Sequence, residues 1–585
     1  VLSEVTMAAI AEIILNPCFL LVLAVLLVLL FLKPSLPERL LIGLKYVVPP
    51  KQEEIEKTIK MKYDAEQTRN RKKARNKASK IPVLHQSHAE LNVGVINRSA
   101  LYEVFGGMVT VSFLGVCGII LGQIMRMVIQ YLFYNDGDAD GTAVGDGMKF
   151  EILLAMAAIV HGWYSLFQIF PYLSWDSYQV RISCQISMVT LGVALACLRV
   201  SSLEGGGSGE TDGNHNAFEF RLDEAYTSFG ALVSGKIIKH ISDTSGSTVA
   251  EKIKIPHVPL GVVHLMAALA ASALTLVNLM CAFRVVKVSQ DIFGGCWSSD
   301  ADTSTLPPQP SSSLQKKKKN RKQKAREGHK TTSASLSGWL AALWRGSSSS
   351  SPSSSLVPMV RLGLSAVILL LPAMISLLWI PMFSRRIIGV QPRPRYYHTP
   401  SSFSSSSSSS THPYEEGAAS PFLGTEHVYA QDGVFAGTRA ALCVVVAVIR
   451  VMLFRGHMQT YLLGELGGLQ KALECAQSSS SKMGVSMISI ALERVSATNK
   501  AVCAVALQLL TPSCISLLLA LLHCATFKRG ESDMPEDATV FDSNFLVFSA
   551  LQHDFTGQIV SFFTWWDQIS WALMIIFAFL LTRTN

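Results

Sequence analysis

Residues 501–527, AVCAVALQLLTPSCISLLLALLHCATF, form a mainly apolar block without a single Asp, Glu, Lys or Arg. About 20 such residues in a helix are enough to cross the hydrocarbon core of a bilayer. Inside hydrocarbon the backbone must satisfy its own hydrogen bonds, so a spanning block is a helix or belongs to a closed barrel. The apolar residues run continuously instead of alternating, and this pattern predicts a membrane-spanning helix.

Eight further blocks show the same pattern. The sequence therefore predicts an all-α, polytopic bundle of nine spans: Ile13–Leu32, Val104–Phe133, Phe150–Phe170, Ile182–Val200, Leu260–Phe283, Leu362–Phe383, Val434–Phe454, Ala501–Phe527 and Ile559–Leu581. The first block is either a retained helix or a signal peptide. No basic region precedes it and no A-x-A cleavage site follows it, which favours the retained helix.

Composition supports a membrane protein. Only 16% of the 585 residues are charged, against about 25% in soluble domains, and mean hydropathy is +0.33. The net charge of +9 is concentrated in Lys60–Lys80 and Lys316–Lys330. Such local basic runs suit loops that face anionic lipid headgroups better than nucleic acid. The expected partners are therefore the bilayer, anionic headgroups and other membrane proteins, in either the plasma membrane or an endomembrane.

The basic residues also predict an orientation, because loops rich in Lys and Arg stay in the cytoplasm. With nine spans, the basic loops 33–103, 284–361 and 455–500 fall on one side, and the acidic loops 134–149 and 528–558 fall on the other. The N-terminus is then outside and the C-terminus inside. The glycosylation sequon at Asn97 lies in the cytoplasm in this arrangement, so a glycan there would invert it.

The loops differ in character. The serine tracts Ser347–Ser351 and Ser404–Ser410 predict disorder over roughly 297–355 and 391–425, within the loops 284–361 and 384–433. In the outer loop 201–259, Phe218–Ile238 has apolar residues at helical spacing and is expected on the membrane surface or as a cap on the bundle. Met458–Ala476 has a similar stripe and should continue the seventh span into the cytoplasm.

Ionisable residues inside spans are functional candidates, because a charge at the bilayer centre costs at least about 2.5 kcal/mol. Arg126 and Arg450 lie near the ends of their predicted spans, from which they can reach the interface. Asp567 directly follows Trp565 and Trp566, so it lies either just below an interface that the tryptophans mark or in a polar interior. The histidines in spans are compatible with hydrogen bonds between helices: His161, His264 and His523.

Few other motifs suggest chemistry. Asp136, Asp138 and Asp140 resemble the first half of a calcium-binding loop, but its twelfth position is Gly147 where a Glu belongs, so a solvated acidic turn is favoured. The cysteines show no metal-ligand spacing, and no nucleophile elbow, HExxH or phosphate loop is present. These features predict no enzyme, no metal and no cofactor. Gly118 and Gly122 have the GxxxG spacing of closely packed helices.

The second half of the chain resembles the transmembrane protein 161 family of eukaryotic multi-pass proteins. The sharpest match is RVMLFRGHMQTYL at 450–462, which fits the family pattern R-x4-R-x-H-x-Q-x-Y-L at every defined position. Weaker matches lie in the sixth, eighth and last spans. The residues that carry the resemblance are Arg450, Arg455, His457, Gln459, Tyr461, Pro372, Trp379, Gln508, Pro512, Trp565 and Trp566.

The resemblance implies an integral membrane protein without established catalytic activity, linked to membrane ion currents and to survival under oxidative stress. We expect a non-enzymatic regulator or scaffold. The motif would form a junction for lipid phosphates or a partner at the inner leaflet, or an interfacial anchor. The alternative is a channel or transporter, which requires polar groups converging at mid-membrane, with His161, His264, Gln508 and Asp567 as candidates and breaks at Pro372 and Pro512.

Overall fold

The computed structural model describes residues 17–48, 87–133, 149–169, 177–203, 259–298, 356–380, 425–478, 501–527 and 554–584, with short pieces of 220–230 and 490–500. Within these ranges, six helices are long and apolar enough to cross a membrane. They are α6 (Tyr102–Phe133), α8 (Ser177–Leu203), α11 (Leu260–Ser298), α15 (Thr425–Ser478), α17 (Val502–Phe527) and α19 (Asp554–Thr584). They confirm the prediction of a helical membrane protein.

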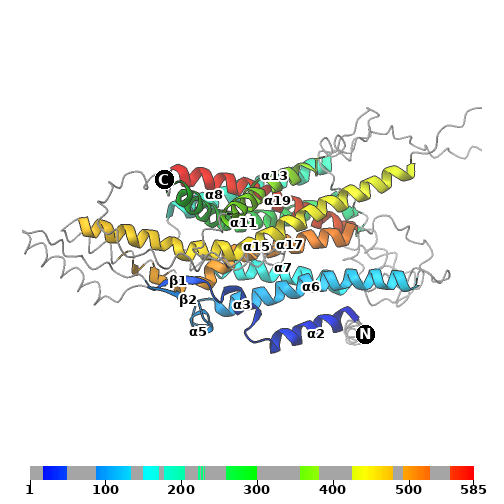
Figure 1. Ribbon diagram of the computed structural model, residues 1–585. Coiled ribbons are helices and arrows are strands. Elements are labelled where there is room, and N and C mark those ends of the chain that lie inside the picture. Colours follow the sequence, from blue (N-terminus) through cyan, green and yellow to red (C-terminus); the bar gives the residue numbers. More distant parts are fainter. Residues whose placement is uncertain are drawn as a thin grey trace, which may run out of the picture.

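Three shorter apolar helices coincide with the remaining predicted blocks: α2 (Pro17–Phe31), α7 (Lys149–Phe167) and α13 (Leu356–Leu377). The helices lie side by side along a common direction, with α2 at one edge against α6 (Figure 1). Helix α17 is at the centre and packs against α6, α7, α11, α15 and α19. In the most apolar stretch of α17, 83% of the residues are buried, whereas in that of the peripheral helix α8 only 17% are. Helix α17 therefore forms the core of the bundle.

Glycines permit the close approach of α6 and α7. A Cβ added at Gly115 would lie 3.0 Å from the Cβ of Ala158, and one at Gly118 would meet Leu154. A Cβ at Gly122 would overlap the buried side chain of Glu151. Small residues let helix backbones approach without a hydrophobic driving force in lipid. The close packing expected of Gly118 and Gly122 is confirmed.

The region before α6 departs from the all-α prediction. It contains α3 (Leu36–Leu41), strands β1 (Lys45–Val48) and β2 (Ser87–Glu90), and α5 (Val93–Ile96). The strands pair antiparallel, with Lys45 opposite Glu90. Each strand has only four residues, too few for an alternating pattern to stand out, and β1 is held by contacts with α15 that lie far away in sequence. The sequence predicted a basic loop here and did not predict its two strands.

Helix α15 has 54 residues, so it is about 80 Å long and exceeds the ~30 Å hydrocarbon core. The predicted continuation through Met458–Ala476 is confirmed, because the helix ends at Ser478. Apart from the helix ends at Ser298 and Thr425, the segments predicted to be disordered lie outside the described residues. So do the basic runs of 60–80 and 316–330.

The described pieces of 220–230 pack onto the bundle as a cap, one of the two positions predicted for this segment. Phe220 is buried and its ring lies 5.5 Å from that of Phe562 and 5.6 Å from that of Trp565. Asp223 contacts His264 of α11, with 3.1 Å between Oδ1 and Nε2. The segment therefore joins α11 to the beginning of α19.

Candidate functional site: a buried polar cluster at mid-span

Asp567 is the centre of a polar cluster that four helices share. Its Oδ2 accepts hydrogen bonds from Ser516 Oγ at 2.7 Å and Gln568 Nε2 at 3.1 Å. Its Oδ1 accepts one from Asn278 Nδ2 at 3.1 Å. The guanidinium of Arg450 faces the same carboxylate, with 3.8 Å between Nη1 and Oδ2. These groups come from α11, α15, α17 and α19, so a single carboxylate connects all four helices.

The cluster lies in the middle of its helices. Arg450 is 13 residues from either end of the apolar stretch Gly437–Leu463, or about 20 Å along the axis. Asp567 is 12 residues after Phe555 and 15 before Thr582, in the apolar stretch of α19. Asp567 is fully buried and Arg450 is 3% exposed. Both charges are therefore far from the ends where a side chain reaches the interface.

The Arg450 guanidinium is stacked on the ring of Trp571, with its Cζ 4.0 Å from the ring centroid. Trp571 Nε1 donates to the carbonyl of Ile368 at 3.0 Å. That carbonyl is free for it because Pro372, four residues later in α13, has no backbone N–H to donate. A fifth helix thus fixes the aromatic ring on which the buried cation lies.

The hydrogen-bonding capacity of the Asp567 carboxylate is met more fully than that of the Arg450 guanidinium. Asp567 accepts three hydrogen bonds from neutral donors, whereas Arg450 makes one long bond from Nη1 to Ser516 Oγ at 3.4 Å. Within the described part of the chain, Arg450 Nε and Nη2 and the amide oxygens of Asn278 and Gln568 have no hydrogen-bond partner. Burying ions costs several kcal/mol each, so each charge here is tolerated mainly because the other is present.

The structure decides between the two positions predicted for Asp567. It faces a polar interior, and Trp565 and Trp566 are buried instead of marking an interface. Trp565 Nε1 donates to Ser376 O at 3.2 Å, and Trp566 Nε1 donates to Ala271 O at 2.8 Å. The two tryptophans bind α19 to α13 and α11.

The interfacial prediction for Arg450 was wrong. Its span was predicted to end at Phe454, but α15 continues for several more turns, which places Arg450 at mid-span. The motif does not present two arginines to lipid phosphates. Arg455 donates from Nη2 to Ile42 O at 2.6 Å and from Nη1 to Arg39 O at 3.3 Å.

Gln459 continues this contact with the N-terminal segment. Its amide donates to Lys45 O and accepts from Lys45 N, both at 2.9 Å, as a neighbouring strand would. Arg455 and Gln459 share one face of α15 through their four-residue spacing, as the sequence predicts. Together they hold residues 39–45 against the helix. His457, which lies between Arg455 and Gln459 in the motif, is buried.

A second polar contact lies two turns further along α11. Arg284 donates from Nε to Gln508 Oε1 at 3.1 Å, and its Cζ lies 5.1 Å from the centroid of the Tyr461 ring. Gln508 was a candidate for a mid-membrane polar site under the channel or transporter alternative, and it contacts Arg284. Pro372 and Pro512 do not break their helices, since α13 and α17 are continuous through them.

The candidate histidines lie apart from Asp567. His161 is on α7 beside Gly107, and His264 contacts Asp223. The His523 ring lies 5.8 Å from that of Trp379, on whose face a second buried arginine, Arg439, is stacked at 4.3 Å. The Arg126 side chain and the acidic turn at Asp136, Asp138 and Asp140 lie outside the described residues. Among the residues that are described, no group of His, Cys, Asp and Glu is arranged to hold a metal ion.

Sequence reasoning missed Asn278, Ser516, Gln568 and Arg439. Asn278 and Gln568 are polar residues inside apolar blocks, and this pattern is a signal by which the sequence could have identified them. Comparisons with protein-family models, curated proteins and solved structures found no match to this chain.

Proposed function

We propose that this chain is a non-enzymatic membrane protein that regulates or scaffolds other membrane proteins, with nine membrane-crossing helices. Six long apolar helices support part of this count, and α2, α7 and α13 would add three. The proposal includes an external N-terminus, an internal C-terminus and a relation to the transmembrane protein 161 family. In that family the corresponding role is the modulation of ion currents and of the response to oxidative stress.

The observation that carries the proposal is the enclosed arrangement around Asp567. The carboxylate is fully buried and accepts hydrogen bonds from Ser516, Gln568 and Asn278, while Trp571 covers the face of Arg450. Polar side chains that hydrogen-bond to one another in this way hold their helices together. This favours a bundle of fixed shape that presents its lipid-facing helices and its extended cytoplasmic helix to partners.

The same cluster supports the second candidate, a channel or transporter. Ionisable residues at mid-membrane are typical of ion and proton pathways. Arg450 also has two nitrogens without a hydrogen-bond partner in the described part of the chain. A pathway would have to open between α15 and α19, where Arg450 meets Asp567.

Reconstitution separates the two functions. The purified full chain is inserted into liposomes loaded with potassium, and flux is followed with a voltage-sensitive dye and a pH dye. In parallel, whole-cell currents are recorded from cells with and without the chain. A regulator changes cellular currents and leaves the pure liposomes tight. Potassium or proton flux through liposomes that contain only this chain, above that of empty liposomes, would establish the channel or transporter instead.

A further inference from the structure

Helix α8 is the least buried of the six long apolar helices. Its principal neighbour among the described elements is α11. On the side that faces α11, Ala194 and Leu198 are buried, and the hydroxyl oxygens of Ser187 and Ser272 lie 2.8 Å apart. The opposite side of α8 is exposed along the whole apolar stretch Arg181–Val200.

The exposed side of α8 carries polar and small residues along its centre. Gln185, Gly192 and Arg199 recur every seven residues, about two helical turns, so they lie along one line. All three are exposed, as is Ala196, one turn after Gly192. A Cβ added at Gly192 would meet nothing within 4 Å. Another helix could therefore approach the backbone of α8 closely at this point.

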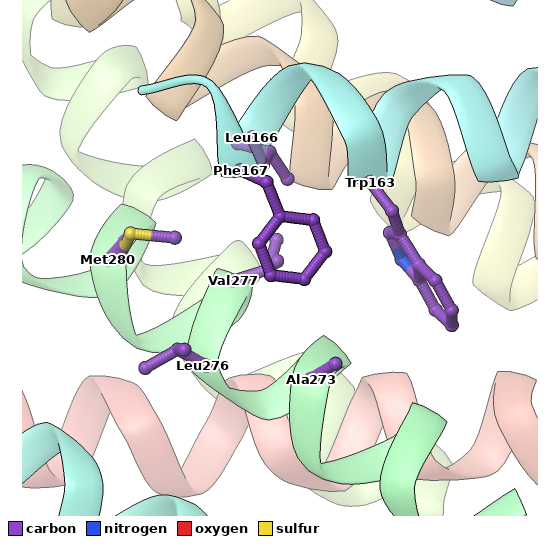
Figure 2. A pocket seen from close by; sticks show the side chains of 7 residues that line it. All are labelled: Trp163, Leu166, Phe167, Ala273, Leu276, Val277 and Met280. Carbon is purple, nitrogen blue, oxygen red and sulfur yellow. The ribbon is translucent and has the colours of Figure 1, made fainter. Parts of the chain in front are cut away.

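Other exposed sides of the bundle carry large apolar side chains. Helix α19 exposes Leu573, Ile576 and Phe579, and α7 exposes Phe167, whose ring stands beside α11 in Figure 2. Among the described side chains of α8, no Leu, Ile or Phe is exposed. The apolar stretch of α8 is also more polar than those of α6, α11, α15 and α17, although each of these is more buried. Polar groups are costly against hydrocarbon, so this side of α8 suits contact with protein better than contact with lipid.

The depth of Gln185 points in the same direction. Arg181 and Arg199 are 18 residues apart, about 27 Å along the helix, which is close to the thickness of the hydrocarbon core. With these arginines at the two membrane surfaces, the Gln185 amide lies one turn inside the hydrocarbon. In membranes, Gln side chains hydrogen-bond across helices, and Gly and Ala let helix backbones approach. The exposed amide and the small residues are separate features that both favour a partner helix.

We propose that the exposed side of α8 binds the same side of a second copy of this chain. Two copies with the same orientation are related by a twofold axis along the membrane normal, so their α8 helices run parallel and equal residues meet at equal depth. Gly192 and Ala196 form the crossing point. A Gln amide is both donor and acceptor, so two Gln185 side chains satisfy each other across the axis. This dimer does not depend on whether the chain regulates other proteins or conducts ions.

Self-association is measured by sedimentation equilibrium of the purified full chain in a density-matched non-ionic detergent, at several ratios of protein to detergent. We expect an equilibrium between monomer and dimer. Gly192→Ile places a branched side chain at the crossing point and should leave the chain monomeric at ratios where the wild type is dimeric. Gln185→Leu should weaken the dimer roughly 3- to 16-fold, the range of one hydrogen bond between membrane helices.

Gly363→Ile is the matched control. Gly363 is an exposed glycine in α13, and a Cβ added there also meets nothing within 4 Å, so this variant should dimerise like the wild type. Because the space around Gly192 is open, Gly192→Ile should keep the helical circular dichroism spectrum, which separates lost association from lost folding. A wild type that is monomeric at every ratio, or a Gly192→Ile variant that dimerises as tightly as the wild type, would overturn the proposal.

Discussion

Removing the carboxylate of Asp567 is the most direct test of the cluster. Asp567→Ala leaves Arg450 as a buried cation without a counter-charge and deprives three donors of their acceptor. Breaking a buried pair by removing one partner typically costs about 3–5 kcal/mol. At roughly 2–4 °C per kcal/mol for large domains, the melting temperature in detergent should fall by about 6 °C or more.

The double variant shows whether the loss comes from the unpaired charge. Arg450→Met removes the cation with little change in length, so Arg450→Met with Asp567→Ala should recover most of the loss. The melting temperatures of wild type, both single variants and the double variant form a double-mutant cycle. A coupling free energy of about 2 kcal/mol or more is expected. Glu103→Ala, at an exposed carboxylate in the first turn of α6, is the matched control and should shift stability by less than about 0.5 kcal/mol.

Two results would refute this reasoning. The first is a single Asp567→Ala variant that melts like the wild type. The second is a double variant whose loss equals the sum of the two single losses. Either result would mean that the 3.8 Å contact between Arg450 and Asp567 contributes nothing to the stability of the bundle.

Three further predictions concern other parts of the fold. Arg455→Ala removes two hydrogen bonds to the N-terminal segment, so limited proteolysis should cut residues 36–48 several-fold faster. The melting temperature of the bundle should stay nearly constant. Equal cutting rates in the variant and the wild type would contradict the contact. Gly115→Ala should destabilise the α6–α7 pair by about 1 kcal/mol in thermal melts, whereas Gly192→Ala, with open space around it, should be neutral or stabilising. Asn97 should carry no glycan, and a mobility shift on endoglycosidase treatment would invert the proposed orientation.

The sequence alone predicts the helices well, because a long apolar block has few alternatives in a bilayer. It predicts poorly how deep a polar side chain lies in the membrane and which side chain it contacts. Arg450 was placed near an interface since its predicted span ended at Phe454, where the apolar residues thin out, although the helix continues to Ser478. When a helix is longer than the membrane is thick, hydropathy alone does not show which of its residues lies at the middle of the membrane. The pairing with Asp567, 117 residues later, depends on how α15 and α19 lie against α17 and has no local signal.

The contacts around Trp571 connect the resemblance motif to the rest of the bundle. Pro372 leaves Ile368 O without its helical donor, Trp571 Nε1 fills that place, and the fixed indole ring covers the guanidinium of Arg450. Arg450 begins the motif, and Arg455, five residues later, holds the N-terminal segment on the same helix. Two arginines less than two turns apart on α15 therefore contact different parts of the protein, the bundle centre and the segment beside β1. A change of partner at either arginine would be transmitted along α15, which is a physical route by which the proposed regulator could respond at the end of α15 that we propose to be cytoplasmic.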